Sequence, residues 1–148
     1  MKKRCINHMT CTLPALSENE SAARAIVAAF LVLPDPTTEE LADIRCAVSE
    51  AVTNAIIHGY RGTAGIVYIS VKLFEDRTVR VEVKDRGCGI ADIKEARQPL
   101  FTTDQSGERG GMGFAVMEAF MDRVRVFSVL GRGTRVVLEK RLKATSDG

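Results

Sequence analysis

The stretch from Ala47 to Tyr60 constrains the fold more than any other part of the chain, because it contains a single charged residue, Glu50. A helix with one side in water normally carries several Lys or Glu residues there, so this stretch is expected to be covered on both sides. A capping box at Thr37 and Glu40 predicts where the helix begins, and Gly59 is predicted as its C-terminal cap. Its apolar stripe consists of Leu41, Ile44, Val48, Val52 and Ala55.

Around this helix the sequence predicts five strands and three further helices. The strands are Ile6–Leu13, Ile66–Phe74, Thr78–Lys84, Val124–Val129 and Thr134–Leu142. The helices are one that opens with a capping box at Ser17 and Glu20 and ends near Leu31, one at Ala91–Arg97 and one at Met112–Asp122. Hairpin-linked strands with helices on one face predict an α+β fold, a two-layer α/β sandwich with a mixed, mostly antiparallel sheet.

Composition limits the class of protein. With 45% hydrophobic residues in 148, and without an internal repeat or linker, the chain is expected to form a single domain over residues 1–148. Basic and acidic residues are nearly balanced, with a net charge of +2, so the charge does not predict a nucleic-acid partner. The four cysteines form no C-x-x-C pair, and neither a signal peptide nor a membrane-spanning stretch is recognisable, so a cytoplasmic location without membrane contact is expected.

Glu50, Asn54 and His58 are spaced by four along the long helix and form a polar column away from its apolar stripe. A carboxylate and a carboxamide one turn apart suit a magnesium ion with its water shell. His58 also fits a structural or capping role, and the low histidine count argues against zinc.

Three glycine-rich loops follow the helix in order. Asp85-Arg86-Gly87-Cys88-Gly89 comes directly after a strand, and its aspartate can accept a hydrogen bond from an amino group. Gly107–Gly113 runs into a helix, whose first N–H groups suit phosphate, and Arg109 adds a charge there. Gly131-Arg132-Gly133-Thr134 also fits an ordinary hairpin turn. Neither a P-loop nor a G-x-G-x-x-G motif is present, so a nucleotide site must belong to another architecture.

The ordered motifs Glu50-x-x-x-Asn54-x-x-x-His58, Asp85-x-Gly87-x-Gly89, Gly111-x-Gly113 and Gly131-x-Gly133-Thr134 resemble the ATP-binding superfamily of gyrase, Hsp90, histidine kinases and MutL, with its Bergerat-type fold. The segments Ser49–Tyr60, Glu95–Thr103 and Gly111–Phe114 are similar to those of the small serine kinases that act as anti-sigma factors, in particular the sporulation type. The resemblance runs from about Leu16 to Leu142.

This resemblance implies ATP and Mg²⁺ as cofactors and assigns roles. Glu50 is expected to be the general base for a substrate serine, Asn54 the magnesium ligand and Asp85 the acceptor for the adenine amino group. The expected nucleotide-binding residues are Asn54, His58, Asp85, Gly87, Gly89, Thr102, Thr103, Arg109, Gly111, Met112, Gly113 and Thr134. Leu100–Gly111 is expected to be the lid over ATP, and Glu20 and Arg24 to belong to a partner-binding surface.

The implied partners are a sporulation sigma factor, an anti-anti-sigma protein as the phosphorylated substrate, and a second copy of the chain. Two alternatives remain open: a stress-response switch kinase of the same family, and a module that sequesters a sigma factor with ATP as a structural ligand. Glu50 favours a kinase over the second alternative, because sequestration needs no general base. A histidine kinase is disfavoured, since no segment is left for a phosphoacceptor helix pair.

Overall fold

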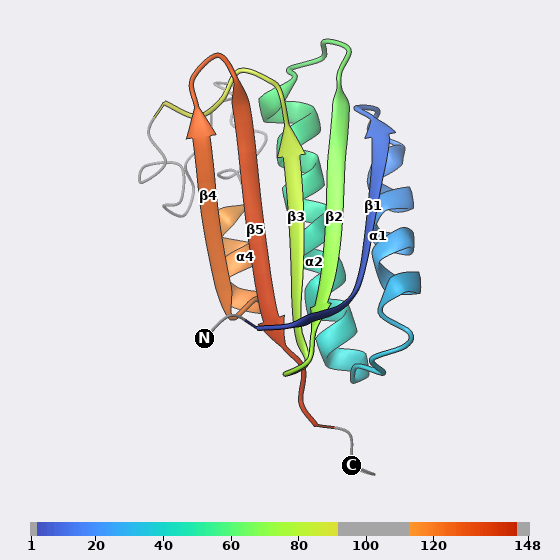
Figure 1. Cartoon of the computed structure of the whole chain (residues 1–148). Helices are drawn as coiled ribbons and strands as arrows, with labels where there is room; N and C mark the ends of the chain where they lie inside the picture. The colour runs from blue at the N-terminus through green and yellow to red at the C-terminus, as the bar shows by residue number, and fades with distance from the viewer. Residues whose placement is uncertain (1–2, 92–112, 145–148) are drawn as a thin grey trace.

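Five strands form one antiparallel sheet in the computed structural model, which describes residues 3–91 and 113–144. The strands are β1 (Cys5–Pro14), β2 (Ile66–Phe74), β3 (Thr78–Asp85), β4 (Arg123–Val129) and β5 (Gly133–Arg141), in the order β1-β2-β3-β5-β4. Helices α1 (Asn19–Phe30), α2 (Thr38–Thr53) and α4 (Phe114–Phe120) lie on one face, and no helix of the described ranges lies on the other face (Figure 1). The predicted two-layer α+β fold is confirmed, and all pairings among these strands are antiparallel.

The core lies between the sheet and α2, which packs against α1 on one side and α4 on the other (Figure 1). Alternate residues of β2 and β3 point into this core, as the sequence pattern predicts. The buried residues of these two strands are Val67, Ile69, Val71, Leu73, Val79, Val81 and Val83. The predicted stripe of the long helix faces them, with Ile44, Val48 and Val52 buried. Burial on both sides explains why the stretch from Ala47 to Tyr60 contains so few charged residues.

The capping box predicted at the start of α2 is confirmed. Thr37 N–H donates to Glu40 Oε1 at 2.9 Å, and Glu40 N–H donates to Thr37 Oγ1 at 3.0 Å. The second carboxylate oxygen of Glu40 accepts the N–H of Lys143 at 2.8 Å. The same side chain therefore caps the helix and ties it to the residues that follow β5.

The capping box predicted at Ser17 and Glu20 is wrong. Helix α1 begins at Asn19 after Glu18, and no side chain caps it. The Glu20 carboxylate instead pairs with Arg24 Nε at 2.9 Å and accepts a hydrogen bond from the hydroxyl of Ser49 on α2. These partners compete successfully for the carboxylate because an ion pair and a hydroxyl donor satisfy it better than one backbone N–H.

The prediction that Gly59 caps the long helix is also wrong. Residues Asn54–Gly59 continue α2 as a π-helix, η1, and the capping position is Tyr60 in right-handed helical conformation. Left-handed backbone occurs later, at Arg61 and Gly62. Gly59 is needed for a different reason: a Cβ there would lie 2.9 Å from the Asp85 Cγ atom, so only glycine allows this close approach.

The remaining elements agree with the sequence pattern where the structure describes them. The β2–β3 turn places Arg77 in left-handed conformation, and its N–H donates to Phe74 O at 2.9 Å. Helix α4 ends at Phe120, slightly earlier than predicted, because Met121 is extended. The predicted helix at 91–97, the predicted lid at 100–111 and the predicted helix start at Met112 lie wholly or almost wholly outside the described residues. Within residues 3–91 and 113–144, no helix has the length and apolarity needed to cross a membrane.

Candidate functional site

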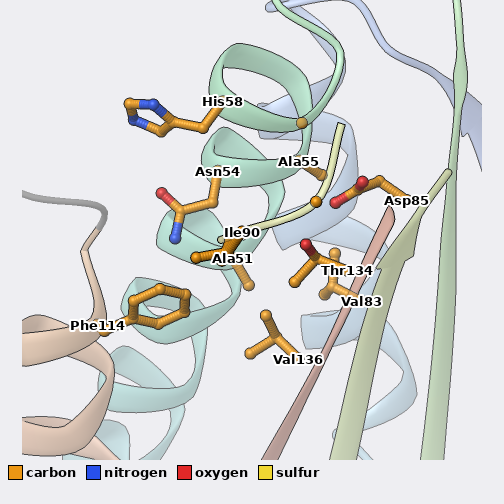
Figure 2. Close-up of a pocket in the computed structure, with 12 residues that line it drawn as sticks. Ala51, Asn54, Ala55, His58, Val83, Asp85, Ile90, Phe114, Thr134 and Val136 are labelled. Carbon is orange, nitrogen blue, oxygen red and sulfur yellow. The ribbon is translucent and has the colours of Figure 1, made fainter. Parts of the chain in front are cut away.

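A pocket of about 320 Å³, counting its open mouth, lies between η1, the ends of β3 and β5, and the start of α4. Figure 2 shows Asn54 and His58 extending from successive turns on one side, with Asp85 and Thr134 on the other. Its apolar walls come from Ala51, Ala55, Val83, Ile90, Phe114 and Val136. A narrow apolar slot with a few converging polar groups is the usual form of a small-molecule site.

Asp85 is the buried carboxylate of this pocket, with 5% of its surface exposed. Its Oδ1 accepts the N–H of Gly87 at 2.9 Å, and Gly59 packs directly against it. Burial raises the pKa of the Asp85 carboxyl above its ordinary value, although the N–H groups of Gly87 and Thr134 act in the opposite direction. Because the surrounding walls are apolar, a ligand amino group would find its strongest acceptor here.

Close backbone contacts within the chain hold the loop after Asp85. Cys88 N–H donates to Gly59 O at 2.9 Å, and a Cβ on Gly87 would overlap that same carbonyl. Gly89 has a φ of +75°, and a Cβ there would overlap the carbonyl of Val129. Gly131 N–H in turn donates to Cys88 O at 2.7 Å, so the first and third glycine loops are joined.

Ser128 is a supporting residue that the sequence motifs did not identify. Its Oγ accepts the N–H of Ile90 at 2.7 Å and lies 2.9 Å from Thr134 Oγ1 and 3.1 Å from Gly133 O. It therefore joins the wall residue Ile90 to Thr134, the polar residue at the start of β5. One feature of the sequence could have identified Ser128: it is a polar residue at the next inward-facing position of β4 after Val124 and Val126.

Asn54 is the first residue of the π-helix and lines the pocket with 8% of its surface exposed. Its Nδ2 is buried and has no hydrogen-bond partner in the described part of the chain. A buried amide group of this kind is costly unless a ligand satisfies it. Single π-turns within α-helices occur frequently at functional sites, and this one places Asn54 and His58 on the same pocket.

Glu50 lies one turn before Asn54 and is not part of the pocket lining. Its carboxylate lies against Gly113, where a Cβ would overlap Glu50 Oε2 and would stand 3.1 Å from Glu50 Cδ. Gly113 precedes α4 and has a φ of +77°. The predicted carboxylate is thus placed between the pocket and the start of α4.

The structure brings together Asn54, His58, Asp85, Gly89 and Thr134 around the pocket, with Gly87 bonded to Asp85 and Gly113 against Glu50. The predicted residues Thr102, Thr103, Arg109, Gly111 and Met112 lie outside the described residues. Apolar lining residues such as Ile90 and Phe114 were not predicted, because their pattern is the same as that of core residues.

Glu20 and Arg24 lie apart from this pocket. They belong to the α1–α2 side of the helical layer, where Ser17, Glu20, Ser49, Thr53, Ile56 and Ile57 line a second hollow. Thr53, Ile56 and Ile57 sit at or within the same π-turn that lines the first pocket, so this turn separates the two hollows.

Comparison with known proteins places this geometry in a family. Residues 13–140 match the model of the histidine kinase-like ATPase domain. The chain is 58% identical over 135 residues to the anti-sigma F factor of Geobacillus sp. (strain WCH70), covering 90% of this chain and 92% of that protein. It is 53% identical over 137 residues to that of Priestia megaterium, covering 92% and 93%. The chain belongs to the anti-sigma F factor family of histidine kinase-like ATPases. It therefore has an ATP-binding domain.

Solved structures agree with the family assignment. A Mycobacterium tuberculosis protein with RsbU and RsbW domains is 26% identical to this chain, with a TM-score of 0.70. The match covers 94% of this chain and 33% of that protein. The catalytic domain of histidine kinase ThkA is 16% identical with a TM-score of 0.56, covering 93% of this chain and 97% of that one. The second comparison supports the fold alone.

Proposed function

We propose that the chain is an anti-sigma factor that binds Mg-ATP in the pocket at Asp85 and phosphorylates a serine of its protein antagonist. The observation that carries the proposal is the buried Asp85 carboxylate in an apolar slot, with Asn54 on the opposite wall. The lining matches the chemistry of a planar base with an amino group, because its apolar side chains suit the faces of the base and Asp85 can accept its N–H. Thr134, held by Ser128, bounds the same end.

Asn54 is the proposed magnesium ligand. Its carboxamide is buried on the pocket wall with an unpartnered Nδ2 among the described residues, which fits a group that becomes satisfied when a ligand binds. An amide oxygen suits magnesium, and the amide nitrogen suits a phosphate oxygen. ATP with its metal supplies the phosphoryl group when bound. Thr102, Thr103, Arg109, Gly111, Met112 and His58 remain expected contributors to nucleotide binding.

Glu50 is the proposed general base. In this role its carboxylate takes the proton of the serine hydroxyl as that oxygen becomes the nucleophile, a contribution of about 10²–10⁴-fold in rate. Its place between Asn54 and Gly113 supports the assignment, because the bare Cα of Gly113 lets the carboxylate approach the start of α4 closely.

The proposed partners are a sporulation sigma factor, which the chain binds and inhibits, and an anti-anti-sigma protein, which it phosphorylates and inactivates. Relatives named anti-sigma F factors, together with the RsbW-containing neighbour, support this assignment. Glu20 and Arg24 are proposed to contact partners from α1, where their 2.9 Å ion pair borders the second hollow. A homodimer is proposed as the working form.

The decisive experiment mixes the purified chain with the anti-anti-sigma protein and γ-labelled Mg-ATP. Labelled phosphoserine on the antagonist is the expected product. ATP binding without any labelled phosphoserine would refute the kinase assignment and leave the sigma-sequestering module. Failure to bind ATP at all would refute the pocket itself, so the two parts of the proposal fail separately.

A further inference from the structure

The face of the sheet opposite the helices is basic. Residues that alternate with the core positions line up across strands, for example Lys72, Arg80, Glu139 and Arg123 in one row and Lys84 and Arg135 in another. The cations on this face are Lys72, Arg80, Lys84, Arg123, Arg125, Arg135 and Arg141, and the carboxylates are Glu82 and Glu139. Among the residues that the structure describes, no helix covers this face (Figure 1). The positive charge is therefore concentrated on this face of the sheet, although the whole chain carries a net charge of only +2.

At one end of this face is a hollow of about 850 Å³ with its mouth included. Four cationic side chains line it: Lys84, Arg86, Arg132 and Arg135. Its apolar part consists of Phe127 and Val129, which are 44% and 59% exposed, with the exposed Leu130 beside them. We name this surface, formed by Lys84, Arg86, Phe127, Val129, Arg132 and Arg135, the basic hollow.

The charge of the basic hollow is only partly neutralised. Arg135 pairs with Glu82 at 2.7 Å, and the Arg86 guanidinium lies 5.1 Å from the centre of the Tyr68 ring. Lys84 and Arg132 form no ion pair with any described residue. Asp85 contributes to the lining, but its carboxylate points into the nucleotide pocket on the other side of the sheet (Figure 2). Unpaired cations beside exposed apolar side chains are the composition of a binding surface for a partner that is acidic and partly apolar.

We propose that the basic hollow docks an acidic protein segment that carries at least one apolar side chain, which packs on Val129 and on the exposed part of Phe127 that the arginine side chains leave open. Its carboxylates meet Lys84 and Arg132 at the rim. This surface lies on the open face of the sheet, whereas the nucleotide pocket and the Glu20–Arg24 surface lie on the helical side. The segment therefore occupies a third site, beyond the proposed function.

Two other occupants fit less well. Nucleic acid would stack bases on open aromatic rings, but the Arg135 guanidinium already lies 4.6 Å from the centre of the Phe127 ring. A second copy joined through the same surface would bring Lys84 and Arg132 of both copies together, because a two-fold interface repeats each patch. The resulting repulsion disfavours self-association at this place.

The test measures binding of a fluorescein-labelled peptide of Glu-Glu-Leu repeats to the full chain by anisotropy. The double variant Lys84→Glu/Arg132→Glu is expected to weaken binding about tenfold or more, because two attractive charges become repulsive. The matched control is Lys72→Glu/Arg123→Glu, an equal change in net charge on the same face outside the hollow, and is expected to change affinity less than about threefold. Unchanged binding of a fluorescent ATP analogue establishes that each variant is folded.

Four outcomes would overturn the proposal. The first is that the control double variant weakens peptide binding as much as Lys84→Glu/Arg132→Glu does. The second is that a Gln-Gln-Leu peptide binds as well as the acidic peptide, and the third is that single-stranded DNA binds more tightly than the acidic peptide. The fourth is loss of a dimer in sedimentation velocity when Lys84 and Arg132 are reversed, which would assign the surface to a second copy. If the double variant does not fold, Arg132→Gln in the exposed β4–β5 turn replaces it, with an expected loss of about threefold.

Discussion

The carboxylate of Glu50 lies against the bare Cα of Gly113, across the gap between the long helix and the start of α4. A methyl group on Gly113 would overlap Glu50 Oε2, so the carboxylate can keep its place only when residue 113 has no side chain. The proposed base is thus positioned by a residue distant from it in sequence.

Gly113→Ala is therefore expected to lower phosphoryl transfer by about 10²-fold, because a displacement of the order of 1 Å at a reacting group has this effect. Steady-state transfer to the antagonist is the measurement. Gly131→Ala is the control: Gly131 has a similar φ of +81°, but a Cβ there meets no atom within 4 Å. Equal losses in the two variants would mean that backbone strain, not Glu50, is responsible.

Glu50→Gln is expected to retain ATP affinity within about threefold while losing transfer by about 10²–10⁴-fold, because the amide cannot accept the hydroxyl proton. Binding of a fluorescent ATP analogue and formation of phosphoserine are measured on the same preparation. Glu39→Gln, in the exposed first turn of α2, is the matched control. If Glu50→Gln abolished ATP binding instead, Glu50 would be a ligand-binding residue and not the base.

Asp85→Asn is expected to weaken ATP binding by roughly 10–100-fold, because the adenine amino group loses a charged acceptor. Titration of a fluorescent ATP analogue measures the loss. Glu82→Gln, a carboxylate on the opposite face of the same strand, is expected to bind ATP normally. If Asp85→Asn left the affinity for ATP unchanged, Asp85 would not be the acceptor for the adenine amino group.

For Asp85→Asn we also predict how the stability of the nucleotide-free protein depends on pH. Burial raises the pKa of Asp85 in the folded state, so its contribution to stability is fully present below the unfolded value of about 3.8 and is lost as pH rises through the folded pKa. Asp85→Asn removes this dependence. Its melting temperature relative to the unmodified chain is therefore expected to increase as pH rises from about 4 to neutrality. A difference that stays flat with pH would show that the carboxyl titrates normally.

The fold was predictable because its signals are local. The alternation of Val67, Ile69 and Val71 defines the inward face of β2 without any knowledge of its neighbours. The capping box at Thr37 likewise involves residues three apart. The capping box predicted at Ser17 was wrong because local patterns do not include partners on other helices. The Glu20 carboxylate accepts a hydrogen bond from Ser49 on α2 instead.

The site was predictable only in its polar residues. Asn54 and Asp85 stand out because polar side chains at buried positions need a reason. Phe114 and Val136 line the same pocket but have the pattern of core residues, and the π-turn at 54–59 has no local signal. The role of Gly59 depends on the approach of β3, so it was mistaken for a helix cap.

Ser128 gives the last prediction, for a residue that no motif marks. Its hydroxyl accepts the Ile90 N–H at 2.7 Å and lies 2.9 Å from Thr134 Oγ1, so Ser128→Ala leaves that N–H without its acceptor and releases Thr134. The expected cost is about 1–3 kcal/mol in the free energy of unfolding, measured by urea denaturation, and a several-fold weaker affinity for ATP. Ser70→Ala, on the open face of β2, is the matched control and is expected to change either quantity little. If Ser128→Ala lowered stability but left ATP affinity intact, Ile90 and Thr134 would be held in place by the β4–β5 hairpin alone, and the serine would contribute to the fold without shaping the pocket.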